Sequence, residues 1–463
     1  MATNSDPKLP DLHVTLIEKT IVKATDPPSE PKLITLSNLD LLSGRFPVSV
    51  FYAYPNPDSA PFPSVLATLR SSLAAVLRHY HPFAGRLVPG PRPDEPQILS
   101  NNAGVEFASA RATLPIAALD LHDLAASLDR GLVPVPDSAP LSVQVTSHPC
   151  GGFSLGLSFD HAVADAHGFT LFLRAWADTA RTGSVSVEPD HRRAEAFKPR
   201  SPPRFGPEID RMLTSCALEE ILNLPQNDIT LKRLYYIQAS DVQRLQRLCS
   251  TGECRRTKIE SFSAYLWKIL ASAGGGGAAA ACKMGWLTDG RTRLSTRYKD
   301  LSNYVGNVVS MALGEATIEE LEAASLPEVG EKVHRAIEEV TNEDHFNDLV
   351  DWIETKRPGL VLAKILLGRD GPAVMVSSGQ RAAVAEVEFG YGAPAVGTCY
   401  SLIPRLGAAY VNPQPSGRGD GSWVVFAILW PALAEALESD PERIFRPVTA
   451  EHLGLSRSDS GQS

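Results

Sequence analysis

The sequence contains little cysteine. Six cysteines occur among 463 residues, and no two of them form a Cys-x-x-Cys pair. Secreted scaffolds stapled by disulfides carry a much higher density of cysteine, and structural zinc sites need closely spaced Cys or His ligands. We therefore expect reduced thiols in a cytoplasmic protein, with no bound metal.

Long hydrophobic runs are absent as well. The longest apolar stretch, residues 423–434, has 12 residues and includes a proline, so it is too short to span a bilayer. Residues 1–11 are polar and lack the apolar core of a signal peptide. The sequence thus predicts a soluble protein with no membrane span.

Positive charge is not in excess. The formal net charge is -9 at pH 7, and the isoelectric point is about 5.7. Nucleic-acid binding relies on a broad basic surface, so we expect no nucleic-acid partner. The composition, 43% hydrophobic and 21% charged, is ordinary for a folded protein, and the length allows two or three domains of about 150 residues each.

Local patterns indicate helices and strands in both halves of the chain. Apolar residues recur at helical spacing over residues 65–80 and again over 169–180. Residues 153–159 instead alternate between apolar and small side chains, which is typical of a half-buried strand. These elements indicate a fold of the α/β or α+β class.

The composition changes between residues 188 and 207. This segment interleaves five prolines with charged residues, and we expect neither a helix nor a central strand at that proline density. We predict a domain over residues 1–187, a crossover linker over 188–207, a second domain over 208–454, and a disordered tail over 455–463.

One histidine stands out by its context. His161 follows the predicted strand and precedes the predicted helix, in the segment Asp160-His161-Ala162-Val163-Ala164-Asp165. A neutral imidazole at such a break can project into a cleft and accept a proton near neutral pH. The alternative is a histidine that merely completes a turn, with Asp165 as the N-cap of the helix. The spacing alone does not decide between them.

Other site chemistries find less support in the sequence. His167 lies six residues after His161, a spacing that fits neither a helical metal pair nor a zinc-finger pattern. No Gly-x-Ser-x-Gly sequence is present, which argues against a serine hydrolase of the elbow type.

Several short fragments occur in a characteristic order. They are His81-Pro82-Phe83-Ala84-Gly85-Arg86-Leu87, His161-Ala162-Val163-Ala164-Asp165, Asp289-Gly290-Arg291, Tyr304-Val305-Gly306-Asn307 and Glu388-Phe389-Gly390-Tyr391-Gly392. In this order and at these separations the sequence resembles the plant BAHD acyl-CoA-dependent acyltransferases, the His-x-x-x-Asp type, and their hydroxycinnamoyltransferase members in particular. The resemblance extends from residues 36–40 to residues 423–430.

The resemblance implies an α/β fold of two similar mixed-sheet domains flanked by helices, like that of chloramphenicol acetyltransferase. A long crossover joins the domains, and a channel between them admits acyl-CoA from one face and the acceptor from the other. Acyl-CoA is then a co-substrate, and neither a bound cofactor nor an oligomer is implied. His161 would be the general base, while Asp165 would be structural and pair with Arg291.

The sequence departs from the family pattern at three places. Val305 stands where the family often has Phe. In the late motif Glu388 replaces Asp and Tyr391 replaces Trp; the family assigns Phe389, Gly390 and Gly392 and their neighbours a structural role. At residues 377–379 hydroxycinnamoyl members show Thr/Ser-Ser-Trp, whose hydroxyl and indole N–H border the reacting carbonyl. Ser377 keeps a donor, whereas Gly379 has no side chain, which would either slow the reaction or admit a bulkier acceptor.

The expected activity is transfer of an acyl group, hydroxycinnamoyl by preference, from CoA to a hydroxyl of a plant metabolite or cell-wall precursor. Three alternatives stay open: N-acylation of an amine, a catalytically inactive protein that binds a ligand or partner, and a thioesterase that uses water. The donor, the acceptor and the pathway do not follow from the sequence.

Overall fold

The computed structural model describes residues 11–26, 30–56, 58–217, 219–220, 230–252, 254–274, 277, 279–294, 300–368, 371–379, 384–402 and 407–455. Among these residues, no helix is both long and apolar enough to cross a membrane. The predicted tail over 455–463 lies outside the described residues except for Leu455, which is buried.

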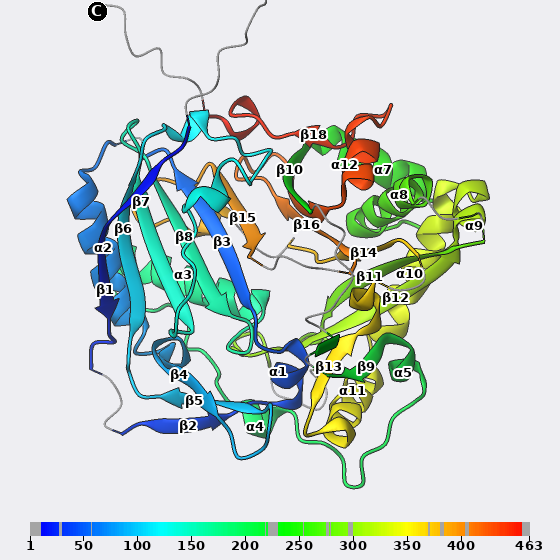
Figure 1. Ribbon diagram of the computed structural model, residues 1–463, viewed down its shortest axis with the longest axis horizontal. Helices are drawn as coiled ribbons and strands as arrows, with labels where there is room; N and C mark the ends of the chain where they lie inside the picture. The colour runs from blue at the N-terminus through cyan, green and yellow to red at the C-terminus, as the bar shows by residue number, and fades with distance from the viewer. Residues whose placement is uncertain are drawn as a thin grey trace, which may run out of the picture.

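In the described part of the chain, two large sheets form the body of the molecule (Figure 1). The first has the strand order β1-β6-β7-β8-β3-β15, and the second has the order β12-β11-β14-β16-β17-β10-β18. Each sheet contains parallel and antiparallel pairs. The expected α/β architecture of two mixed-sheet domains is therefore confirmed.

The strands of the first sheet are β1 (Val14–Val22), β3 (Pro47–Tyr54), β6 (Val105–Ala112), β7 (Leu141–Ser147), β8 (Phe153–Asp160) and β15 (Val396–Ser401). Those of the second are β10 (Leu231–Ile237), β11 (Ala281–Asp289), β12 (Val309–Thr317), β14 (Ala373–Val376), β16 (Ala409–Pro415), β17 (Trp423–Leu429) and β18 (Arg446–Pro447). Two small sheets comprise β2 (Lys32–Thr35), β4 (Arg86–Pro89) and β5 (Pro96–Ser100), and β9 (Leu213–Cys216) with β13 (Leu360–Ala363).

The helices are α1 (Asn38–Ser43), α2 (Phe62–Val76), α3 (Ala166–Thr182), α4 (Arg193–Ala196), α5 (Glu208–Met212), α7 (Ala239–Cys249), α8 (Lys258–Ala273), α9 (Ile318–Ala323), α10 (Leu326–Val340), α11 (Glu343–Lys356) and α12 (Pro431–Glu438). Helices α2 and α3 share one buried apolar cluster with β6, β7 and β8, so they cover one face of the first sheet (Figure 1). This burial explains the helical spacing of apolar residues in both segments.

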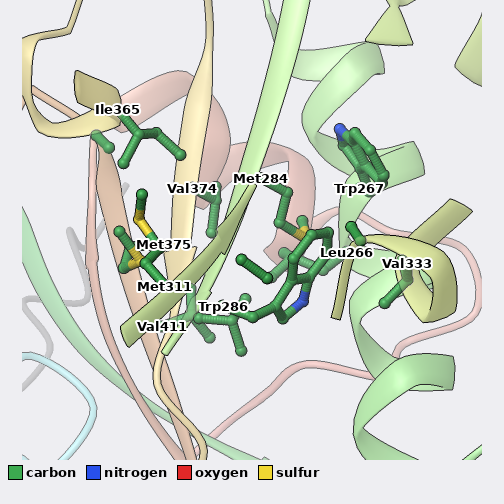
Figure 2. Packing of buried hydrophobic residues seen from close by; sticks show 14 of the residues in the cluster. Leu266, Trp267, Met284, Trp286, Met311, Val333, Ile365, Val374, Met375 and Val411 are labelled. Carbon is green, nitrogen blue, oxygen red and sulfur yellow. The ribbon is translucent and has the colours of Figure 1, made fainter. Parts of the chain in front are cut away.

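The core of the second domain lies between its sheet and helices α8 and α10. Figure 2 shows Trp267 of α8 beside Met284 and Trp286 of β11, with Val333 of α10 on the same side. The two indole rings meet edge to face with centroids 5.8 Å apart, a favourable arrangement for aromatic pairs. This packing fixes the sheet whose strands carry half of the site described below.

Strand β15 returns from the second half of the chain to the first sheet. It pairs antiparallel with β3 along its whole length, from Val396 opposite Ala53 to Ser401 opposite Val48 (Figure 1). Strand β15, which lies within residues 208–454, is therefore an edge strand of the first sheet. The physical reason is that β3 would otherwise present an open edge of unpaired backbone groups, which β15 satisfies.

The segment predicted as a crossover, residues 188–207, is not free of helix. One helical turn, α4, lies inside residues 188–207, in the stretch between Pro189 and Pro199 where no proline interrupts it. The segment also joins the second domain at Asp190, whose backbone pairs with that of Tyr304. The prolines therefore exclude a long helix here without excluding a short one.

Candidate active site

The histidine loop connects β8 to α3. The strand ends at Asp160, and the helix begins at Ala166 with Asp165 as its N-cap, whose carboxylate accepts from the Gly168 N–H at 2.9 Å. At the other end, Asp160 accepts from the Ala162 N–H at 3.0 Å. The two carboxylates thus accept hydrogen bonds from backbone N–H groups of the loop and of the first helical turn. These bonds stabilise the turn between the strand and the helix.

A cavity of about 1590 Å³ lies between the two sheets, and His161 is part of its wall. Both domains contribute to it, since its lining includes residues of β3 and β15 as well as residues of β11, β12, β16 and β17. Much of the wall is apolar. Representative lining residues are Val48, Val50, Phe159, Leu287, Met311, Met375, Phe426 and Ile428.

His161 is held at its backbone and against one ring. Its N–H donates to the Phe46 carbonyl at 3.0 Å, and its imidazole lies 4.7 Å from the Phe46 ring. The buried Nδ1 has no hydrogen-bond partner among the described residues. Burial lowers the pKa of His161 below its ordinary 6.5, so the imidazole is neutral near pH 7 and can accept a proton.

Asp165 and Arg291 form a buried ion pair between the domains. Both Nη atoms of Arg291 donate to the carboxylate, at 2.8 and 3.0 Å, and each side chain is 2% exposed. Asp165 also accepts from the Val308 N–H at 3.0 Å. Burial alone would raise the pKa of Asp165, but the charge and hydrogen bonds of Arg291 lower it, so the carboxylate stays ionised and fully engaged.

A second buried ion pair lies at the same loop and was missed by the sequence reasoning. Arg193 and Asp40 meet at 2.9 Å, and both side chains are 0% exposed. Residues 36–40 had contributed to the family resemblance without any assigned role. The signal available in the sequence was an arginine inside the crossover, which by itself does not indicate burial.

Ser377 and Gly379 line the cavity on an extension of β14. Their N–H groups donate to the Val411 and Pro413 carbonyls of β16 at 2.9 and 3.0 Å. A Cβ at position 379 would overlap Gln414 Cγ. The side chain of Gln414, which sequence reasoning also missed, therefore occupies the space beside Gly379 and gives this wall an amide.

The late motif lies away from the cavity, because none of residues 388–392 belongs to its lining. Glu388 accepts from the N–H groups of Gly390, Tyr391 and Gly392, so its carboxylate closes a turn in which both glycines have positive φ. Phe389 is buried against Trp176, with ring centroids 4.9 Å apart, and the Tyr391 hydroxyl donates to Thr68 Oγ1 at 2.8 Å. The motif thus anchors the second half of the chain on α2 and α3.

The described residues include no group of three His, Cys, Asp or Glu side chains placed to hold a metal ion. What the fold does bring together is an interdomain cavity, a neutral histidine in its wall and buried ion pairs that tie the histidine loop to both domains. These features define a two-domain α/β protein with a candidate active site between its sheets.

Comparison with known proteins identifies the family. A model of the transferase family matches residues 12–444. Agmatine hydroxycinnamoyltransferase 1 of Oryza sativa subsp. japonica is 29% identical over 85% of this chain and 89% of its own length. The fatty alcohol:caffeoyl-CoA acyltransferase of Arabidopsis thaliana is 29% identical over 83% and 88%.

Solved structures show the same fold. Vinorine synthase matches with a TM-score of 0.71 at 19% identity, over 94% of this chain and 99% of that one. F. sporotrichioides TRI101, complexed with coenzyme A and T-2, matches with a TM-score of 0.72 at 16% identity, over 90% and 99%. The chain therefore belongs to the transferase family, the BAHD family indicated by its motifs, and it is an acyl-CoA-dependent acyltransferase.

Proposed function

We propose that this protein transfers a hydroxycinnamoyl group from a CoA thioester to a hydroxyl of a small molecule, with His161 as the general base. The observation that carries the proposal is the neutral, partly buried imidazole in the wall of the interdomain cavity. Acyl-CoA is the co-substrate; the acceptor is a plant metabolite or cell-wall precursor.

The reaction needs one proton acceptor and no covalent acyl-enzyme. His161 takes the proton from the acceptor hydroxyl as its oxygen attacks the thioester carbonyl. The tetrahedral intermediate collapses, the C–S bond breaks, and the CoA thiolate recovers the proton from the imidazolium. Because an alcohol does not ionise by itself near neutral pH, a positioned base contributes roughly 10²–10⁴-fold to the rate.

The apolar wall and the relatives support an aromatic acyl donor. Side chains such as Phe159, Met311 and Phe426 offer a surface suited to a hydroxycinnamoyl ring. Hydroxycinnamoyl or caffeoyl groups are named in the titles of both curated relatives above. Ser377 and the amide of Gln414 supply polar groups to the same cavity.

The charges of the cavity favour a neutral acceptor over a diamine. Among the described lining residues, every carboxylate except Asp94 on the exposed rim is already paired with an arginine. A cationic amine needs a free carboxylate to compensate its desolvation, whereas a hydroxyl does not. The pairs are Asp40 with Arg193, Asp165 and Asp289 with Arg291, Glu95 with Arg357, and Glu386 with Arg174.

The test is release of CoA thiol by the purified protein, using hydroxycinnamoyl and aliphatic acyl-CoAs with pooled alcohols or amines. His161→Ala is compared with His334→Ala, a histidine on α10 that does not line the cavity. Release that requires an alcohol and is lost only in His161→Ala supports the proposal.

Other outcomes select the alternatives. Release only with amines indicates N-acylation, and release without any acceptor indicates a thioesterase. No release from the folded protein across the panel leaves a binding protein. The expected monomeric state and cytoplasmic location stay predictions.

A further inference from the structure

We propose that Arg193, the buried arginine of the crossover, is a positioning residue for His161. Together with Asp40 and Asn307 it binds the backbone carbonyls of the histidine loop and thereby sets the direction of the imidazole. The kinetic test of this inference rests on the proposed function. Its spectroscopic test does not require turnover.

The guanidinium of Arg193 contacts the loop directly. Its Nη1 donates to Asp40 Oδ1 at 2.9 Å and to the Ala162 carbonyl at 3.4 Å, and its Nη2 donates to the Val163 carbonyl. Ala162 and Val163 are the two residues that follow His161. The donors of one buried side chain therefore hold two consecutive carbonyls of the loop.

Asn307 extends this set of contacts to His161 itself. Its Nδ2 donates to the His161 carbonyl at 2.9 Å and to Asp40 Oδ1 at 2.9 Å, and its backbone N–H donates to the same oxygen at 2.8 Å. The other oxygen, Asp40 Oδ2, accepts from the N–H and the hydroxyl of Ser37 at 2.9 and 2.8 Å. Three successive loop carbonyls are thus bound by one buried polar cluster centred on Asp40.

The direction of the His161 imidazole is set by these contacts to the backbone of the loop. Its Nδ1 has no hydrogen-bond partner among the described residues, so no carboxylate orients the ring through that atom, as happens in many catalytic histidines. Its other neighbours are the Phe46 and Phe159 rings and the side chain of Asn307, and its direction otherwise follows from the conformation of the loop. Because the loop carbonyls are fixed by Arg193 and Asn307, the Cα–Cβ direction of His161 is fixed with them.

The crossover places Arg193 for this role. The Asp190 N–H donates to the Asn303 carbonyl and the Val305 N–H donates to the Asp190 carbonyl, both at 2.8 Å. These bonds tie the crossover to the segment that carries Asn307. A buried ion pair often adds little to stability compared with an apolar pair of similar volume, so the geometry of the loop is the better reason for the Arg193–Asp40 pair.

The decisive variant is Arg193→Met combined with Asp40→Asn, which removes both buried charges together. Its matched control is Arg192→Met, since Arg192 is the neighbouring residue, is about half exposed and pairs with Asp190 at the surface. We expect the double variant to fold but to unfold at a lower temperature than the wild type, because the Ala162 and Val163 carbonyls lose their donor. We expect its kcat to fall roughly 10–100-fold, because misplaced catalytic groups lose about that much, with little change in KM.

The second readout is the His161 imidazole resonance of protein labelled with ¹⁵N-histidine. A shift of that resonance in the double variant, absent in Arg192→Met, supports the proposal even if no acyl transfer is found. A folded double variant with the wild-type resonance and, where the enzyme turns over, wild-type kcat overturns it. Failure of the proposed function would instead appear as a wild-type protein without acceptor-dependent thiol release.

Should the double variant not fold, Asn307→Ser decides in its place. This substitution removes the amide donor to the His161 carbonyl without adding or removing a charge. A shifted His161 resonance with reduced kcat supports the proposal, and wild-type values of both overturn it.

Discussion

Gly379 and Gln414 lie side by side on neighbouring chain segments, and the side chain of one fills the space that the other leaves. A Cβ on residue 379 would overlap Gln414 Cγ and come within 3.1 Å of Asn412 Oδ1. The Gln414 amide donates to Asn412 Oδ1 at 2.6 Å, and Asn412 donates to the Ser377 carbonyl at 2.6 Å. Gly379 therefore leaves room for a polar wall that includes Gln414 and Asn412. The space of the family's tryptophan is filled by Gln414 and is not left empty.

This relationship predicts how a tryptophan at 379 would behave. Gly379→Trp should destabilise the protein by about 1–3 kcal/mol through overpacking, and it should lower kcat/KM. Adding Gln414→Gly should recover most of the stability, because the indole then has room. Thermal unfolding and thiol release of the two single variants and the double variant measure this coupling. Additive effects would show that the two positions are independent.

The pH dependence of the rate should follow His161. Burial lowers the pKa of its imidazole below 6.5, and the neutral form is the one that accepts a proton. Activity should therefore persist as the pH falls through 6.5 and be lost only as it passes the lowered value. A profile of kcat/KM against pH checks this. An acid limb at or above 6.5 would contradict the lowered pKa of His161.

The Asp165–Arg291 pair should matter for folding at least as much as for chemistry. Asp165→Ala leaves the Arg291 charge buried without its partner, which costs about 3–5 kcal/mol in the free energy of unfolding. Urea denaturation measures the loss. Glu18→Ala is the control, since the Glu18–Arg70 pair is exposed and worth about 0–1 kcal/mol. Equal effects of the two substitutions would refute the structural role.

Substitutions in the late motif should reduce stability and leave catalysis intact. Phe389→Ala removes a buried ring and should cost about 3–5 kcal/mol. Tyr391→Phe removes the hydrogen bond to Thr68 and should cost about 0.5–1.5 kcal/mol. Neither residue lines the cavity, so kcat/KM of the folded enzyme should stay near wild type. A large loss of kcat/KM without a loss of stability would place the motif in the site.

The sequence by itself determined the local frame of the site. Alternation over residues 153–159 and helical spacing over 169–180 predicted what became β8 and α3, so the break that carries His161 was visible without a structure. Periodicity locates an element because it is a local property, but it did not give the burial of β8: residues 153–159 are buried on both faces rather than on one. The order of the short motifs then indicated the family, and through it the pairing of Asp165 with Arg291.

Only the tertiary structure decided which distant groups meet. Arg193 and Asp40 are separated by 153 positions, β15 crosses from the second half of the chain to the first sheet, and Gln414 fills the space beside Gly379. None of these contacts leaves a periodic signal, because each depends on the path of the chain between the partners rather than on the residues beside them. The histidine could be found from its neighbours in sequence, whereas the groups that hold its loop are neighbours only in space.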